Sequence, residues 1–238
     1  MRFLIILIPV LLSTSAPLQA RALYISSGFT PPLSDLFERV LAEVDRRLDS
    51  VEIEFQPMQA ERSVKLVQAG INDGDCCRVP EVFKDDERLI FVSPSFVSIR
   101  WNAFSRDKNI AISSFEDLKY YSVGVVSGWK LAVNKIRDIA PEHYQILDTP
   151  EQMFRMIQLQ RLDVGVINYL NGLYALNNLN IEDIHAIQPP LANTPLHLML
   201  SSKHRDLVPE IAAVLEQMEQ QGTIAEIYTK FEKDFLER

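Results

Sequence analysis

A short strand that passes through a glycine turn into a helix is the feature of this sequence that most limits its fold. Residues 121–126 form a β-branched run, and Ser127 and Gly128 interrupt it. From Trp129 onward, apolar residues recur among polar ones at helical spacing. The turn predicts either an ordinary α/β crossover or backbone amides that bind an anion beyond the end of the strand. The residues of that candidate site are Ser127, Gly128, Trp129 and Lys130.

The region before this turn repeats the order of strand and helix. Residues 22–26 predict a strand, and after a rigid proline loop a helix is expected with Ser34 as its N-cap. Residues 51–55 alternate apolar and polar side chains as in a half-buried strand, and residues 60–69 predict the next helix. Successive β–α units predict a parallel sheet.

A second lobe is expected to follow the extended segment at residues 96–104. Thr149 is placed to cap a helix that begins with a proline, and Asn168 and Tyr169 stand at the end of another short strand. Residues 196–200 alternate as a strand that would run back between the lobes. Amphipathic helices near the C-terminus are expected to cover the first lobe.

The N-terminus has the features of a secretory signal peptide. Arg2 precedes the apolar run at residues 3–12, and small residues end the segment near residue 20. The run is too short to span a bilayer, although a retained membrane anchor is the alternative interpretation. The chain carries a net charge of −8 and no basic run, which makes nucleic acid an unexpected partner.

The only cysteines, Cys76 and Cys77, are neighbours in the sequence. Adjacent residues on a strand point to opposite faces, so the sequence favours unbonded cysteines, one of which packs inward. A vicinal disulfide in an oxidising compartment is the alternative.

No catalytic, metal or cofactor motif stands out. The histidines are scattered, and the chain has no His-Glu-x-x-His, nucleophile-elbow or phosphate-loop pattern. We therefore expect no metal, no cofactor and no enzymatic activity.

Polar and aromatic residues near strand ends are the remaining candidates for a binding site. Arg62, Arg78 and Arg88 can each clamp a carboxylate through a bidentate pair. For Arg62 and Arg88 a solvated surface charge is the alternative, and Arg78 lies among apolar residues. Phe29 and Trp129 are placed either to stack on an organic ligand or to pack in the core.

Five motifs follow one another along nearly all of the chain beyond the predicted signal peptide. They are Gly28-Phe29-Thr30-Pro31, LVQAGINDGD at 66–75, VGVVSGW at 123–129, QRLDV at 160–164 and the pattern at 215–230. In this order and spacing they resemble the solute-binding proteins of family 3, the periplasmic receptors best known for polar amino acids.

The resemblance implies an α/β fold of two lobes that are joined by two hinge strands and close on a solute. Residues 21–100 and 194–238 would form the first lobe and residues 101–193 the second, after a signal peptide at 1–20. It also implies that the chain is periplasmic and monomeric, and that it binds a small-molecule solute and delivers it to an ABC-type membrane permease or to a sensor protein. A small dehydratase-like enzyme on the same fold is the alternative.

The resemblance also assigns roles to residues. Phe29 matches the aromatic that stacks on the ligand, Arg88 resembles the arginine that grips its carboxylate, and Gly128, Trp129 and Lys130 match the amides that share it. Asn168, followed by Tyr169, stands where amino-acid receptors carry an acid for the ligand's ammonium group. An amide cannot balance that charge, and Arg78 adds a further cation. An acidic or dicarboxylic solute is therefore expected.

Overall fold

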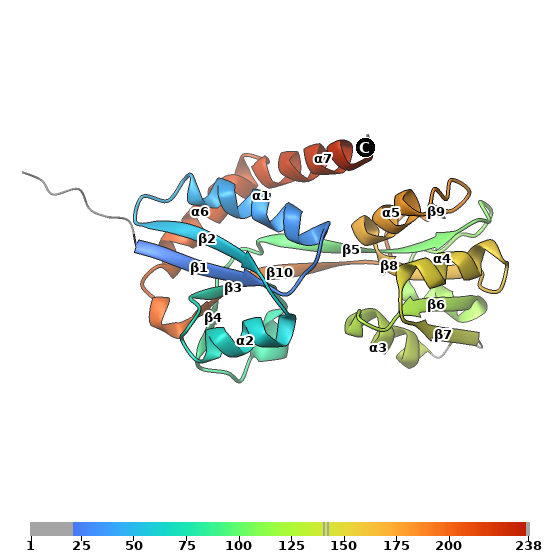
Figure 1. Cartoon of the computed structure of the whole chain (residues 1–238), viewed down its shortest axis with the longest axis horizontal. Coiled ribbons are helices and arrows are strands. Elements are labelled where there is room, and N and C mark those ends of the chain that lie inside the picture. The colour runs from blue at the N-terminus through green and yellow to red at the C-terminus, as the bar shows by residue number, and fades with distance from the viewer. Residues whose placement is uncertain (1–20, 140, 142, 237–238) are drawn as a thin grey trace, which may run out of the picture.

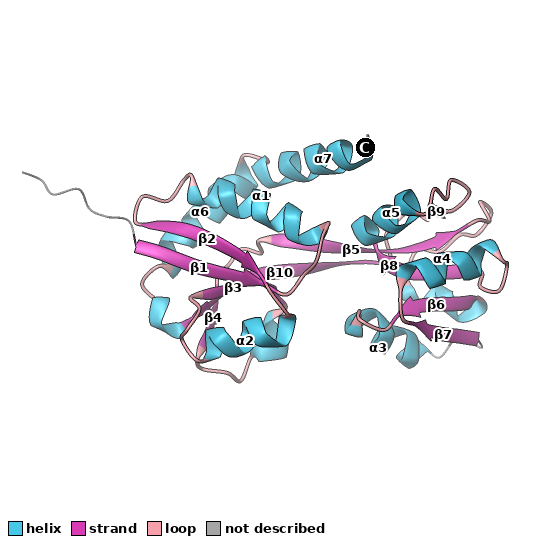
Figure 2. Cartoon of the chain, viewed as in Figure 1, coloured by secondary structure: helices cyan, strands magenta, loops and turns pink. Residues whose placement is uncertain are grey.

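The computed structural model of the chain describes residues 21–139, 141 and 143–236. The predicted signal peptide, residues 1–20, lies outside the described residues. Figure 1 shows two α/β lobes, one at each end of the molecule, with extended strands between them. Figure 2 shows that helices cover the sheets of both lobes.

The first lobe is built on parallel strands that alternate with helices. In its sheet β1 pairs in parallel with β2 and with β3, and β3 and β4 pair antiparallel with β10. The strands are β1 (Arg21–Ser27), β2 (Val51–Pro57), β3 (Gly74–Arg78), β4 (Leu89–Phe91) and β10 (Ala192–Ser201). The helices are α1 (Leu33–Asp45), α2 (Ala60–Gln68), α6 (Val208–Gln220) and α7 (Thr223–Leu236).

The second lobe repeats this plan. Strand β6 pairs in parallel with β7 and β8, and β8 and β9 pair antiparallel with β5. The strands are β5 (Val97–Ser105), β6 (Ser122–Val126), β7 (His143–Leu147), β8 (Val164–Asn168) and β9 (His185–Ala186). The helices are α3 (Lys130–Ile139), α4 (Pro150–Gln158) and α5 (Tyr169–Asn178).

Strands β5 and β10 form the hinge. Residues 97–101 pair antiparallel with residues 192–196, and beyond this ladder β5 enters the second lobe while β10 returns to the first. The predicted lobe boundaries at residues 100 and 194 fall inside this ladder. Ile99 and Trp101 are buried in the larger core cluster, which includes residues of both lobes.

Two predicted helix starts have different outcomes. Thr149 caps α4 as expected, because its side chain accepts a hydrogen bond from the Gln152 amide at 3.2 Å. The N-cap assigned to Ser34 is wrong, since α1 begins at Leu33 and Ser34 is buried within its first turn. There the amides of Leu33 and Ser34 both donate to the Thr30 carbonyl, so the backbone closes the turn without a side-chain cap.

The C-terminal helix α7 is bonded to the hinge. Burial raises the pKa of Tyr228 to about 12, so its hydroxyl stays protonated and donates to the Ser98 carbonyl at 2.9 Å. The hydroxyl oxygen of Tyr228 also accepts a hydrogen bond from the Ser98 amide at 3.1 Å. Arg100, two residues further along β5, pairs with Glu232 of α7, and its guanidinium lies 4.3 Å from the Tyr169 ring centroid in the second lobe. Helix α7 therefore contacts hinge strand β5 next to the place where Arg100 of that strand contacts the second lobe.

No helix among residues 21–236 of the structure is both long enough and apolar enough to cross a membrane, the two gaps in that range excepted.

Candidate functional site

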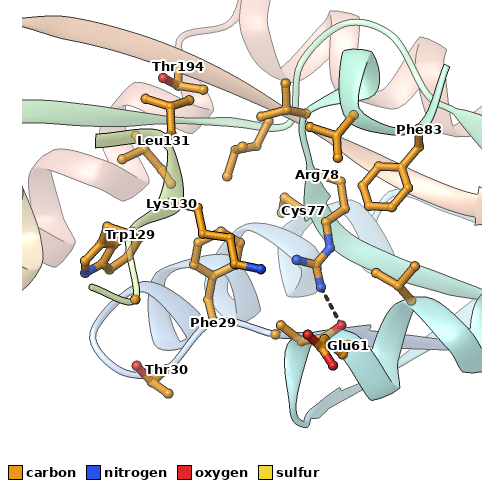
Figure 3. A pocket seen from close by; sticks show the side chains of 18 of the residues that line it. Phe29, Thr30, Glu61, Cys77, Arg78, Phe83, Trp129, Lys130, Leu131 and Thr194 are labelled. Atoms are coloured by element: carbon orange, nitrogen blue, oxygen red, sulfur yellow. Dashed lines mark hydrogen bonds between the residues drawn. The ribbon is translucent and has the colours of Figure 1, made fainter. Parts of the chain in front are cut away.

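A cavity of about 730 Å³ lies between the lobes. The first lobe contributes the loop after β1, one face of α2 and the end of β3, and the second lobe contributes the turn from β6 into α3. The segment at residues 79–83, which follows β3, and the hinge strands β5 and β10 supply the remaining wall (Figure 3). This volume falls in the range of small-molecule sites, about 300–1,000 Å³.

Aromatic rings from both lobes meet at one side of the cavity. The ring centroids of Phe29 in the first lobe and Trp129 in the second are 6.3 Å apart. Trp101 of the hinge packs edge-on against Trp129 at 5.6 Å, and its indole N–H donates to Thr194 at 3.0 Å. Phe29 also packs against buried Phe37 at 5.2 Å, so the rings are held in place before a ligand arrives.

Arg78 stands at the end of β3 and points into the cavity (Figure 3). Its Nη2 donates to Asp75 Oδ2 at 2.8 Å and to the Ala60 carbonyl at 3.3 Å. Asp75 is completely buried and also accepts a hydrogen bond from Ser63. Burial raises the pKa of Asp75 above its ordinary value, although the Arg78 guanidinium and the Ser63 hydroxyl both oppose the rise. Asp75 therefore depends on Arg78 for its charge.

Lys130 reaches the cavity from the second lobe as the first residue of α3. Figure 3 shows its ammonium group and the Arg78 guanidinium pointing toward each other. Both groups are positive and they come from opposite lobes. An anion placed between them would be attracted by both.

The backbone amides expected to bind an anion are only partly free. The Ser127 amide donates to the Leu147 carbonyl at 2.8 Å, and the Trp129 amide donates to the Val126 carbonyl at 3.1 Å. Within the part of the chain that the structure describes, the amides of Gly128 and Lys130 have no such partner. Ser127 is exposed and lies outside the cavity lining, so the site predicted at this turn shrinks to Gly128, Trp129 and Lys130.

Arg62 and Arg88 do not join the cavity lining. Arg62 lies on the exposed face of α2. Arg88 is exposed, and its Nε and Nη2 both bond to Asp86, at 2.7 and 2.8 Å. The expectation that Arg88 grips a ligand carboxylate is not met by this placement, because Asp86, two residues before it, already occupies its fork. Arg78 is the arginine that faces the cavity.

Asn168 and Tyr169 also lie elsewhere. Asn168 is buried and caps α5, with its side chain accepting from the Asn171 amide at 3.0 Å. Tyr169 lies beneath the Arg100 guanidinium on the α7 side of the hinge. The strand end that carries these residues therefore stabilises a helix start and the hinge rather than the cavity wall.

The cysteines form a disulfide with each other, so the favoured expectation of unbonded cysteines is wrong. Both are buried, and Cys77 lines the cavity beside Arg78 (Figure 3). The expectation of opposite-facing side chains assumed regular strand geometry, which the end of β3 does not keep.

Several lining residues were not singled out from the sequence. On α2 these are Glu61, Val64, Lys65 and Gln68. Their spacing of three and four residues places them on one helix face, and this is the signal that could have identified them. Trp101 and Thr194 carried no such signal, because their place depends on the pairing of β5 with β10.

Gly28 is expected to tolerate no side chain. A Cβ there would lie 2.4 Å from the Ala60 Cα and 2.8 Å from the Arg78 Nη2. Replacing Gly28 by alanine should therefore displace the start of α2 or Arg78 and lower the free energy of unfolding by about 1–3 kcal/mol. The matched control is Gly128→Ala in the same cavity, where a Cβ would meet no atom within 4 Å. Urea unfolding of both variants tests this, and equal midpoints would contradict it.

No protein-family model matches the chain, and no curated protein matches its sequence. Solved structures do match its fold. The probable amino-acid ABC transporter extracellular-binding protein YtmK from Bacillus subtilis is 16% identical, with 90% of this chain and 99% of that chain covered and a TM-score of 0.69. The GluR0 ligand-binding core in complex with L-glutamate is 17% identical, with coverage of 90% and 99% and a TM-score of 0.67.

A histidine kinase sensor domain with similarity to periplasmic binding proteins is 14% identical, covers 89% of this chain and 96% of its own, and has a TM-score of 0.62. At these identities the similarity shows the fold. The chain has the two-lobed α/β fold of the periplasmic binding proteins, and the predicted fold class is confirmed.

Proposed function

We propose that this protein binds a small anionic organic solute in the cavity between its lobes. The observation that carries the proposal is that Lys130 and Arg78, one from each lobe, point toward each other across an aromatic-walled cavity. Like charges that face each other repel, and an anion between them removes the repulsion and attracts both. A ligand that contacts both lobes binds the closed form better than the open form, so it shifts the population toward closure.

The proposal extends to location and partners. A chain with the predicted signal peptide would be exported to the periplasm and would work there as a monomer. It would pass the solute to an ABC-type permease, since a probable amino-acid ABC transporter extracellular-binding protein is among the structural neighbours. A sensor role is the alternative, since another neighbour is the sensor domain of a histidine kinase.

We propose binding without catalysis. Glu61 is the acidic side chain in the described cavity lining, it is exposed, and no histidine lies beside it. An acid/base pair held over the solute would favour the dehydratase-like alternative, and one neighbour is an amino-acid-binding ancestor of cyclohexadienyl dehydratase. A solute released from the protein should therefore be recovered chemically unchanged.

Titration calorimetry on the purified protein tests the proposal directly. The probes are glutarate, L-glutamate and 3-phenylpropanoate, together with 3-phenylpropylamine, which replaces the carboxylate by an ammonium group. We expect at least one carboxylate to bind and the amine not to bind. Binding of the amine with equal affinity, or of none of the carboxylates, would overturn the proposal.

Replacing Lys130 by alanine should weaken carboxylate binding about 10- to 100-fold, because a charge-assisted hydrogen bond is worth about 1.5–3 kcal/mol. Lys135→Ala is the matched control, since Lys135 is exposed on the same helix and lies outside the cavity lining. Equal losses in the two variants would show that a general electrostatic effect, rather than contact with the solute, is responsible.

A further inference from the structure

We infer that the solute is a monocarboxylate with an apolar body of aromatic size and without an ammonium group. This inference rests on the proposed function and names the class of solute for the same cavity. Of the acidic or dicarboxylic solute that the sequence suggested, it keeps the acid and drops the second carboxylate. It follows from three properties of the cavity: its charge, the lack of a buried carboxylate among its described lining residues, and its apolar wall.

The charge of the cavity fits one negative charge on the solute. Arg78, Lys130, Lys65 and Glu61 line it, which gives three positive side chains and one negative side chain. Asp75 lies directly behind Arg78 and supplies a second negative charge at 2.8 Å from the guanidinium. One positive charge then remains uncompensated. The second anionic group that Arg78 seemed to require from a solute is thus provided by the protein itself.

An ammonium group on the solute would find no buried partner. Asp75 is 0% exposed and is sealed from the cavity by Arg78, so it cannot reach a solute. Glu61 lines the cavity on the same face of α2 as Lys65, but its side chain is exposed to solvent and so offers no desolvated counter-charge. Asn168, at the strand end where an ammonium partner was considered, lies outside the cavity lining. A desolvated cation without a counter-charge is costly, so α-amino acids are disfavoured.

The wall is largely apolar. Phe29 and Trp129 lie at one side of the cavity and Phe83 at the other (Figure 3), and aliphatic residues and the disulfide-bonded Cys77 also line it. The apolar lining residues include Phe29, Val64, Cys77, Phe83, Trp129 and Leu131. Rings pack favourably against other rings and against sulfur. A compact dicarboxylate would leave this surface uncovered and would desolvate a second charge against it.

A matched ligand series tests the inference. 3-Phenylpropanoate has the proposed features, L-phenylalanine adds an α-ammonium group, 3-phenylpropanamide removes the charge, and glutarate replaces the ring by a second carboxylate. We expect 3-phenylpropanoate to bind most tightly in calorimetry, and each of the other compounds to bind at least about tenfold more weakly, which corresponds to about 1.4 kcal/mol.

The outcomes separate the inference from the proposed function. Tighter binding of glutarate, L-glutamate or L-phenylalanine than of 3-phenylpropanoate would overturn the inference and leave anion binding intact. Equal binding of 3-phenylpropanamide would also overturn it, because the carboxylate would then play no part. If no carboxylate in the series bound, both the inference and the proposed function would be overturned.

A variant pair tests the contribution of the wall. Leu131 is 37% exposed and lines the cavity on the first turn of α3, so Leu131→Gln changes polarity with little change of size. We expect it to weaken 3-phenylpropanoate about threefold or more, by the loss of buried apolar surface, and to leave glutarate unaffected. Leu159→Gln is the control, because Leu159 is 62% exposed and lies away from the cavity. Unchanged 3-phenylpropanoate binding in Leu131→Gln would contradict the role given to the apolar wall.

Discussion

Replacing Arg78 by alanine is expected to lower the free energy of unfolding by about 3–5 kcal/mol, the typical result of breaking a buried ion pair. Asp75 is completely buried, and Arg78 holds its carboxylate at 2.8 Å. Without the guanidinium, Asp75 would keep only the hydrogen bond from Ser63 in place of a counter-charge. Urea unfolding monitored by tryptophan fluorescence measures the loss.

The pH dependence of this loss has a definite sign. Burial already raises the pKa of Asp75 in the folded protein, and removal of Arg78 raises it further. A carboxyl whose folded pKa is raised favours the folded state at low pH, and this contribution is lost as the pH rises through the folded pKa. The deficit of the variant should therefore be larger at about pH 7.5 than at about pH 5.

Two further variants make the test selective. Arg78→Ala combined with Asp75→Asn should be more stable than Arg78→Ala alone, because the buried charge is removed with its partner. Arg88→Ala should leave the urea midpoint unchanged, since Arg88 pairs with Asp86 on the surface. A wild-type midpoint in Arg78→Ala at neutral pH would show that Asp75 does not depend on this pair.

Replacing Asp73 by alanine should cost about 2–3 kcal/mol, because it leaves buried donors without an acceptor. Asp73 accepts from the Tyr24 amide at 2.9 Å, from Lys203 at 2.9 Å and from the Nε2 of His204 at 2.6 Å. His204 is 0% exposed, and its Nδ1 has no hydrogen-bond partner among the residues described. The side chain of Asp73 thus ties β1 to the segment between β10 and α6.

Low pH should reduce the difference in stability between wild type and Asp73→Ala. Burial pushes the pKa of Asp73 upward, but the bonds from Tyr24, Lys203 and His204 outweigh burial and hold the pKa below its ordinary value. A carboxyl with a lowered folded pKa stabilises the folded state above its unfolded pKa, and this stabilisation is lost as the pH falls through the folded pKa. Thermal unfolding of wild type and Asp73→Ala should therefore converge in acid.

Asp73→Asn is the matched control for this site. It keeps a side-chain oxygen that can accept from Tyr24 or His204 and removes only the charge, so it should lose less than alanine does. An asparagine variant as unstable as the alanine variant would assign the effect to charge, and an alanine variant as stable as wild type would contradict the prediction.

Much of the fold could be predicted from local patterns. The periodicity of residues 22–26 and 51–55 gave the first parallel strands, and the alternation at 196–200 gave the strand that returns to the first lobe. Thr149 marked a helix start through its side chain. The prediction for Ser34 was wrong because the Thr30 carbonyl accepts the hydrogen bonds from the first amides of the helix. A contact between backbone groups does not require a particular side chain, so the sequence pattern does not reveal it.

The site was less predictable, because it depends on which strand ends face each other. Phe29, Arg78 and Trp129 line the cavity as the sequence suggested. Arg88 could not be assigned, since whether a surface arginine binds a ligand or its neighbour Asp86 depends on the local turn. Trp101 enters the wall only through the register of β5 against β10, a long-range pairing that local spacing does not reveal.

The hydrogen bonds and ion pair between α7 and the hinge affect how a partner protein could recognise the surface of this molecule. Tyr228 fastens this helix to β5, and the Arg100 that pairs with Glu232 also covers a ring of the second lobe. If one lobe rotates against the other, either these bonds are strained or helix α7 moves together with the hinge. The surface on the side of the molecule that bears α7 would then change its outline with each binding event. Under the proposed function, a membrane partner that docks there would distinguish the solute-bound form from the empty form without contacting the solute.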